Sequence, residues 1–257
     1  MLSNHKFHLS ALLSLFSFQF SISATPNQPI WSKNAVSFPV VCYSNSRPAR
    51  QKVCKPFKII SPDGNSYVQV EYKRNPGNED SLVDLSVVSG GKALGAVGMP
   101  GFVEDEVLWS PDSKAFFING NNNANTDYHV YVYLLRDSGL TIVDPLHHAL
   151  KDMIRTFPAC RALNPYEHCE DVVEHPSDWV GVAGIDWVNG SSSIVVMLEM
   201  NESSMVGGIL GQVLGYEIEI PTGKILRRME AKDFARRWQH SMAWKFNIPD
   251  PPEYSAK

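Results

Sequence analysis

The densest group of chemically versatile side chains is an acidic, histidine-containing stretch at residues 167–175. If this stretch is helical, His168, Asp171 and His175 fall on one face, where imidazole and carboxylate groups together bind a transition metal. The spacing matches no established ligand signature. The competing interpretation is a solvated segment held by a disulfide at Cys169. If Cys169 is oxidised, it cannot serve as a metal ligand.

Two further stretches have weaker ligand chemistry. Residues 121–127 are rich in Asn and include Asp127, and such oxygens suit Ca²⁺. One carboxylate without EF-hand spacing also fits an ordinary hairpin loop. Residues 207–215 contain four glycines, but they do not form a GxGxxG or P-loop pattern, and no helix is expected after them. We therefore expect an inter-strand loop or bulge there, and no bound cofactor.

The sequence contains no familiar nucleophile motif. Neither G-x-S-x-G nor H-E-x-x-H occurs. The adjacent His147 and His148 fall in a segment expected to be helical, where they point to different faces. The absence of these motifs makes an enzyme a less favoured interpretation. A catalytic constellation scattered over loops is the alternative.

Residues 1–24 are typical of a secretory signal peptide. Lys6 lies near the start, the apolar run Leu9–Ile22 follows, and Ala24 is a small residue suited to cleavage. The alternative is an uncleaved anchor, although the run is short for a membrane span. We expect an exported chain, periplasmic or extracellular, that does not span a membrane once the peptide is removed.

Composition narrows the class of protein. The 257 residues are 44% hydrophobic and 19% charged, which is ordinary for a folded domain and excludes general disorder. The net charge of −4 argues against a nucleic-acid binder, because phosphate contacts need clustered Lys and Arg.

The four cysteines agree with export. They form two sequence-local pairs, Cys42 with Cys54 and Cys160 with Cys169, and an even count in an exported chain predicts disulfides. Three pairings are formally possible, of which the local one needs the least rearrangement. No C-x2-C unit is present, which argues against structural zinc.

A turn between two β-like segments recurs along the chain. Pro fixes φ at the second turn position, Asp hydrogen-bonds back to the turn, and Gly tolerates positive φ. The turn occurs three times, and the third copy lacks the Ser-Pro-Asp pattern of the other two. Its Asn-Gly pair is itself a strong hairpin turn. The three turns are Ser61-Pro62-Asp63-Gly64, Ser110-Pro111-Asp112-Ser113 and Asn189-Gly190.

A second hairpin follows each of these turns. The alternation of apolar and polar residues then predicts three units of four short strands, at about 57–97, 106–143 and 183–229. Trp109 and Trp187 occupy the same place before their turns.

The run Trp109-Ser110-Pro111-Asp112-Ser113-Lys114, together with the Ser-Pro-Asp-Gly turn at 61–64, resembles the WD40-like, TolB-type β-propeller repeat. The resemblance covers most of residues 57–229 apart from an insertion. It implies that each turn joins the two inner strands of a blade. It also implies a protein-binding role, since TolB-type propellers are known for such interactions.

The number of units found here differs from the number of blades in that family. Closed propellers have four to eight blades, and here only three units are found. Residues 31–55, with the β-like run Val36–Tyr43, are a candidate for a partial fourth blade. Otherwise the sheets must stack as an open array or pair with another chain, and their exposed edges need a cover.

Two helical segments interrupt or follow the repeat. The insertion at 144–182 is expected to begin with a helix at 146–157, with Asp144 as its N-cap. A C-terminal helix is expected at 231–244. Its stripe of Phe234, Trp238 and Met242 is expected to dock on the sheets, the alternative being a surface that binds a partner or a membrane.

Together these observations predict a mainly β chain after residue 24, a single domain at 25–257. It is a propeller-like array of four-stranded antiparallel units with a helical insertion and a C-terminal helix. The favoured function is non-catalytic binding of an envelope or extracellular protein, a class that includes inhibitors and immunity-like proteins, with residues 144–182 as the contact region. The alternatives are a hydrolase acting on a saccharide or peptide and a structural envelope component.

Overall fold

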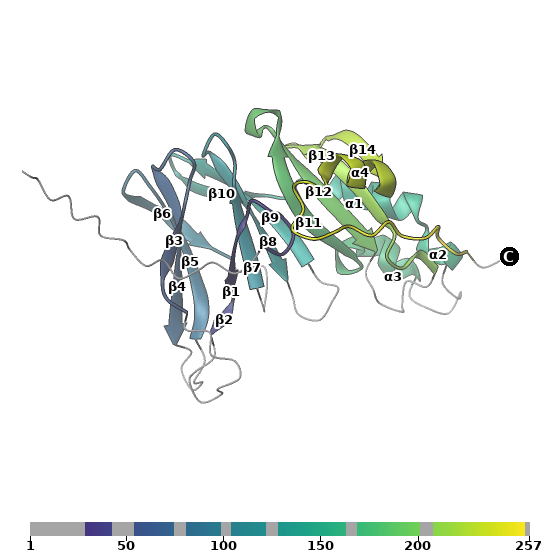
Figure 1. Ribbon diagram of the computed structural model, residues 1–257, viewed down its shortest axis with the longest axis horizontal. Helices are drawn as coiled ribbons and strands as arrows, with labels where there is room; N and C mark the ends of the chain where they lie inside the picture. Colours follow the sequence, from purple (N-terminus) through teal and green to yellow (C-terminus); the bar gives the residue numbers. More distant parts are fainter. Residues whose placement is uncertain are drawn as a thin grey trace, which may run out of the picture.

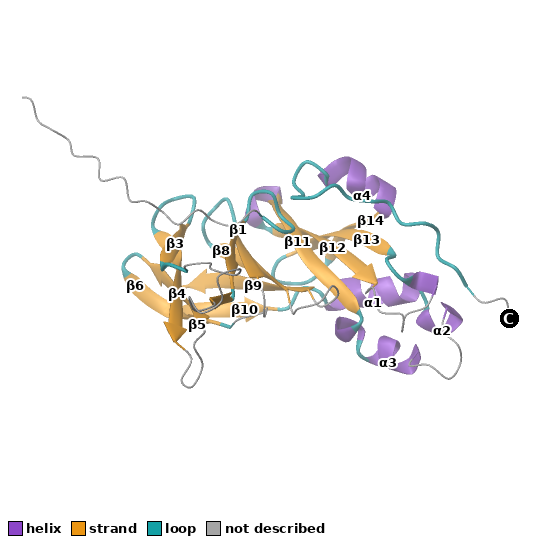
Figure 2. Ribbon diagram, turned by 60° about the horizontal axis from the view of Figure 1, so that its bottom comes forward, coloured by secondary structure: helices purple, strands orange, loops and turns teal. Residues whose placement is uncertain are grey.

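The computed structural model describes residues 29–42, 54–74, 81–98, 104–121, 128–162, 169–200 and 208–254. Three antiparallel sheets follow one another along the long axis of the molecule, and the helices gather around the third sheet (Figures 1 and 2). The prediction of a mainly β chain is confirmed. The expected signal peptide, the Asn-rich residues 122–127 and His168 lie outside the described residues.

The first sheet is built on the unit at 57–97. The buried residues of its second strand alternate with partly exposed ones, as in Val68 and Val70 against Tyr67 and Gln69. A short strand from the N-terminal segment joins the same edge as the last strand of the unit. The strands are β2 (Val41–Cys42), β3 (Phe57–Ile60), β4 (Ser66–Arg74), β5 (Ser81–Ser89) and β6 (Lys92–Val97).

The second sheet lies between the other two and is buried on both faces. Neighbouring residues of its central strand, Phe116 and Phe117, pack into different hydrophobic clusters on the two sides. Its order is β1-β7-β8-β9-β10. The strands are β1 (Val36–Pro39), β7 (Glu104–Trp109), β8 (Ala115–Asn121), β9 (Tyr128–Arg136) and β10 (Gly139–Val143).

The third sheet is an antiparallel meander of four strands, interrupted by one bulge in each outer pairing. Its near face packs against the second sheet and the insertion helices, and its far face packs against the C-terminal segment. The strands are β11 (Val180–Val188), β12 (Ser193–Met200), β13 (Val213–Glu219) and β14 (Ile225–Glu230).

Within the described part of residues 31–55, the two strands form no unit of their own, so the candidate for a partial fourth blade was wrong there. β1 pairs with β7 of the second sheet, and β2 pairs with β5 of the first sheet. Phe38 and Val40 are buried in the core between these two sheets. The segment is too short to form a sheet of its own and instead joins the edges of the two sheets.

The predicted turns form matching hydrogen-bond networks. The Ser61 hydroxyl donates to the Asp63 carboxylate at 2.7 Å, and it accepts the Ser66 N–H at 3.0 Å. Ser110 makes the corresponding contacts with Asp112 and Ala115. The fourth residue of each of the first two turns has a left-handed backbone, with φ of 75° at Gly64 and 63° at Ser113, and so does Ser191, which follows Asn189-Gly190 and has φ of 77°.

The turns also connect each sheet to the next in the same way. The Asp63 N–H donates to the Ser113 hydroxyl at 3.0 Å, and the Asp112 N–H donates to the Ser191 hydroxyl at 3.1 Å. The indole of Trp187 donates to the Leu108 carbonyl at 3.1 Å, matching the bond that Trp109 makes to the first sheet. The relation of the first sheet to the second is therefore repeated between the second and the third.

The C-terminal segment covers the far face of the third sheet. Helix α4 (Ala231–Trp238) places Phe234 against the strand at Gly215, where a Cβ would overlap the Phe234 ring. The helix ends at Trp238, earlier than the expected residue 244. The reason is that residues 241–243 pair with residues 31–33, so their backbone groups bond to the N-terminal segment.

A buried carboxylate fastens that N-terminal segment. Glu106 accepts the backbone N–H groups of Ile30, Trp31 and Ser32, and it also accepts the side-chain amide of Asn119 at 2.7 Å. Burial raises the pKa of the Glu106 carboxyl, and these hydrogen bonds oppose that shift. Glu106 therefore holds the N-terminal segment, together with the C-terminal residues paired to it, against the second and third sheets.

Candidate functional site

The insertion has a core side and an outer side. Its elements are α1 (His147–Thr156), α2 (Ala159–Ala162), α3 (Cys169–Glu174) and the short 3-10 helix η2 (Pro176–Asp178). The predicted apolar face of α1 lies in the core beside the third sheet, and Met153 and Val172 are fully buried there. Of the insertion residues that the structure describes, only those on the outer side are therefore available to bind a partner.

Local sequence explains where α1 begins and ends. The regular helix begins at His147, and its N-cap is Leu146 without a side-chain cap, so the expected N-cap role of Asp144 was wrong; the Asp144 carboxylate instead accepts the Leu146 N–H at 3.0 Å, just before the helix. The helix ends at Thr156, two residues before Pro158, which cannot continue the backbone ladder.

A disulfide holds the second half of the insertion in place. Cys160 of α2 and Cys169 of α3 are bonded, as are Cys42 and Cys54, so the predicted local pairing is confirmed. The described cysteines include no free thiol. Cys169 is consequently not a metal ligand.

The buried carboxylate of Asp152 is the hub of a polar network beneath the outer side of α1. It accepts the Tyr216 hydroxyl at 3.0 Å and pairs with the Arg228 guanidinium at 2.9 Å. It also pairs with Arg155, one helical turn along α1. Burial and the neighbouring Asp152 charge raise the pKa of the Tyr216 hydroxyl, which therefore stays protonated and donates.

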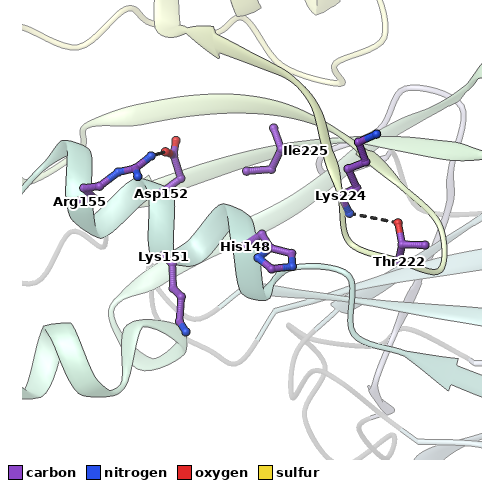
Figure 3. Close-up of a pocket in the computed structure, with 7 residues that line it drawn as sticks. All are labelled: His148, Lys151, Asp152, Arg155, Thr222, Lys224 and Ile225. Atoms are coloured by element: carbon purple, nitrogen blue, oxygen red, sulfur yellow. Dashed lines mark hydrogen bonds and ion pairs between the residues drawn. The ribbon is translucent and has the colours of Figure 1, made fainter.

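An open pocket of about 530 Å³ lies above this network, between α1 and the start of β14. We call it the α1–β14 pocket. Its cations outnumber its single carboxylate, Asp152. Figure 3 shows Arg155 turned onto Asp152, while the ends of Lys151 and Lys224 point away from each other. The lining residues are His148, Lys151, Asp152, Arg155, Thr222, Lys224 and Ile225.

A second hollow of about 510 Å³, the α1–α3 groove, lies on the other side of the same helix. Leu150 and Ile154 are buried in the core, and their outer edges line the groove, while Val173 on α3 is 52% exposed. Most of the surface area that lines the groove is apolar. The lining residues are His147, Leu150, Lys151, Ile154, Arg155, Val173, Glu174 and Pro176.

The two hollows share Lys151 and Arg155, which form a cationic ridge between them. His147 lines the groove and His148 lines the α1–β14 pocket, as expected for adjacent residues on different faces of a helix. A smaller hollow of about 210 Å³ continues from Leu150 toward Tyr131 and Ile142 on the second sheet. All three hollows are therefore lined by the insertion.

The predicted metal cluster is not assembled by the described residues. Asp171 is exposed on α3, and His175 is exposed just after that helix. Within the described ranges, no three His, Cys, Asp or Glu side chains come close enough to form a ligand set.

The glycines at 207–215 have packing and turn roles where they are described. Gly208 lies against the backbone of Glu253, Gly211 has a φ of 69°, and Gly215 makes room for Phe234. These close approaches explain the glycines without a bound phosphate.

Sequence reasoning missed the Asp152 network and the groove. Tyr216 lies 64 residues from Asp152, so their spacing carries no local signal. The helical pattern contains no clue either, because Asp152 lies outside the predicted apolar stripe, about 100° around the helix from Met153. The groove depends on how α3 folds back onto α1, which the disulfide spacing alone does not specify.

No protein-family model, curated protein or solved structure matches this chain significantly. Among the described residues, no helix is both long and apolar enough to cross a membrane.

Proposed function

We propose that this chain is an exported binding module that holds a protein partner on the outer side of its insertion. We call this surface the insertion face and define it by Lys151, Arg155 and Lys224 with the α1–α3 groove. The observation that carries the proposal is the exposure of the Val173 side chain. This side chain is more than half exposed on a disulfide-tethered helix, beside a groove lined by Leu150 and Ile154.

Two other surfaces of the described residues are already covered. The spaces between the sheets are filled by core side chains. The far face of the third sheet is covered by α4 and the N-terminal segment. The insertion face combines hollows, an exposed apolar side chain and net positive charge, which are the features of a binding surface.

Export is part of the proposal. Two disulfides between sequence-local cysteines suit an oxidising compartment, because cytosolic thiols are kept reduced. The expected signal peptide at 1–24 supplies the route.

The WD40-like, TolB-type resemblance belongs to the proposal as well. Three four-stranded meanders, each joined to the next through the same turn and tryptophan contacts, support a propeller-like array. We propose that the array is open, because Figure 1 places its first and third sheets at opposite ends of the molecule. The array then serves as a rigid support for the insertion.

The test compares two matched variants expressed from the chain's own leader with a C-terminal tag. Val173→Asp places a charge on the insertion face, and Ile60→Asp does the same at a similarly exposed apolar residue, 61% exposed, on the first sheet. After cross-linking and purification, we expect one stoichiometric protein partner with wild type and Ile60→Asp, and its loss with Val173→Asp. A partner lost only from Ile60→Asp would refute the insertion face.

A further inference from the structure

We infer that the partner presents an extended acidic segment carrying one aliphatic side chain, and that this segment crosses α1. The inference rests on the proposed function and specifies the chemistry of its site. The aliphatic side chain occupies the α1–α3 groove beside Val173. Carboxylates that follow it lie over the ridge of Lys151 and Arg155 and reach Lys224.

Charge selects the acidic segment. The chain as a whole carries a net charge of −4, yet the two hollows that the segment crosses are lined by three Lys and Arg residues against two acids, Asp152 and Glu174. Within the described part of the chain, the ammonium groups of Lys151 and Lys224 form no ion pair. Arg155 is paired, but its side chain is 81% exposed, and a guanidinium has further donors for a second carboxylate.

Geometry selects a chain over a small anion. Lys151 and Lys224 point away from each other, so they do not converge on one bound group (Figure 3). Carboxylates spaced along a peptide match this arrangement better than a single phosphate or sulfate. An α-helix with its side chains is about 10 Å across, and an extended chain rises about 3.3 Å per residue. An aliphatic residue in the groove therefore lies about three residues before the first carboxylate.

The groove favours a protein side chain over a lipid. Glu174 and His147 line the groove with the apolar residues, so an acyl chain longer than a leucine side chain meets polar groups. An acidic chain is also repelled from an anionic membrane surface. A single Leu, Ile or Val side chain fits against Leu150, Ile154 and Val173.

The experiment measures peptide binding to the purified, oxidised full chain by fluorescence polarisation. The probe is a labelled Leu-Gly-Ser-Glu-Glu peptide. One control peptide replaces both Glu residues by Lys, and another replaces Leu by Ser. We expect the probe to bind, and each control peptide to bind about tenfold more weakly or not at all, since 1.4 kcal/mol corresponds to tenfold. Binding should weaken as salt rises, because the carboxylate contacts are exposed.

Matched variants of the chain locate the contact. Lys151→Glu and Val173→Asp should each weaken binding about tenfold, whereas the exposed control variants Lys232→Glu and Ile60→Asp should change it less than about twofold. Thermal melts should match wild type for every variant compared. Binding that is equal for the acidic and basic peptides, or unaffected by Lys151→Glu, would overturn the inference.

Failure of the inference can be told apart from failure of the proposed function. If the cross-linked partner is lost with Val173→Asp but the acidic peptide does not bind, the insertion face stands and the peptide chemistry is wrong. Lys151-dependent binding to phosphatidylglycerol vesicles without peptide binding would also overturn the inference, in favour of a lipid. Loss of the partner from Ile60→Asp alone refutes both.

Discussion

The indole N–H of Trp109 donates a hydrogen bond to the main-chain carbonyl of Ile59 in the preceding sheet, at 3.0 Å. Trp187 makes the same kind of bond to the Leu108 carbonyl. Ile60 stands in the first unit at the position that Trp109 and Trp187 occupy in the others, and it is exposed. The first unit therefore lacks the side chain by which each later unit attaches to the preceding sheet.

This relationship predicts the effect of Trp109→Phe. The change leaves the Ile59 carbonyl without its donor and removes part of a buried ring, so we expect a loss of about 2–3 kcal/mol in the free energy of unfolding. Urea denaturation followed by circular dichroism measures it. Trp238→Phe is the control, because the Trp238 indole N–H has no acceptor among the described residues. If Trp238→Phe lowers the free energy of unfolding as much as Trp109→Phe does, the hydrogen bond from Trp109 to Ile59 has no special role in stability.

Ser113 has two roles in its turn. It has a φ of 63°, and its hydroxyl accepts the Asp63 N–H of the preceding turn. Ser113→Ala loses the bond and keeps the left-handed backbone, so we expect a loss of about 1 kcal/mol in unfolding free energy. Ser113→Gly loses the same bond but relieves the backbone, so it should be the more stable of the two variants. The same order is expected at Ser191, and the reverse order at both positions would contradict this account.

The turn carboxylates predict a pH dependence. Hydrogen bonds from Ser61 and from the Asn65 N–H lower the pKa of Asp63 from 3.8 to about 2. Partial burial opposes the same shift at Asp112, but bonds from Ser110, the Lys114 N–H and Ser191 lower its pKa as well.

Because the folded-state pKa of Asp63 is the lower one, its contribution to stability is present above about pH 4 and is lost as the pH falls toward 2. We expect Asp63→Asn to flatten the decline in unfolding free energy across that range. The measurement is urea denaturation at successive pH values. Asp137→Asn, at an exposed turn, controls for the loss of one negative charge, and an equal flattening there would contradict the assignment.

The Asp152 network predicts non-additive destabilisation. Asp152→Ala removes the acceptor of Tyr216 and the partner of Arg228, so we expect a loss of about 2–3 kcal/mol, reduced from the fully buried case because Arg228 is partly exposed. Tyr216→Phe should cost about 1 kcal/mol. Since both changes break one bond in common, the double variant should lose less than the sum of the two. Strict additivity in urea denaturation would show that the groups act independently.

The local pattern of the sequence was sufficient for the strands and turns. Alternation in β4 and the proline-aspartate turns depend on neighbouring residues only, and the structure has strands and turns there. The apolar stripe of α1 was equally readable. Its core position was not, because an amphipathic helix docks on whatever surface the fold brings to it.

Contacts between distant residues could not be predicted in the same way. Glu106 binds the backbone of residues 30–32, more than 70 residues away, through N–H groups that carry no side-chain signal. The early end of α4 has the same origin, because residues 241–243 pair with residues 31–33. The split of Val36–Cys42 between two sheets also depends on where those sheets lie, not on the segment itself.

The two disulfides provide a final test of where binding occurs. Each closes a short loop, with separations of 12 and 9 residues, so replacing either pair by Ser should cost about 2–4 kcal/mol in unfolding free energy. Only the Cys160–Cys169 bond ties α3 to α2, the helix that follows α1, and Val173 and the groove depend on the position of α3. We therefore expect Cys160→Ser/Cys169→Ser to lose partner binding at a temperature where the chain is still folded. Cys42→Ser/Cys54→Ser should show a similar drop in melting temperature but retain the partner. Equal loss of binding from both double variants would mean that general stability, and not the insertion face, governs the interaction.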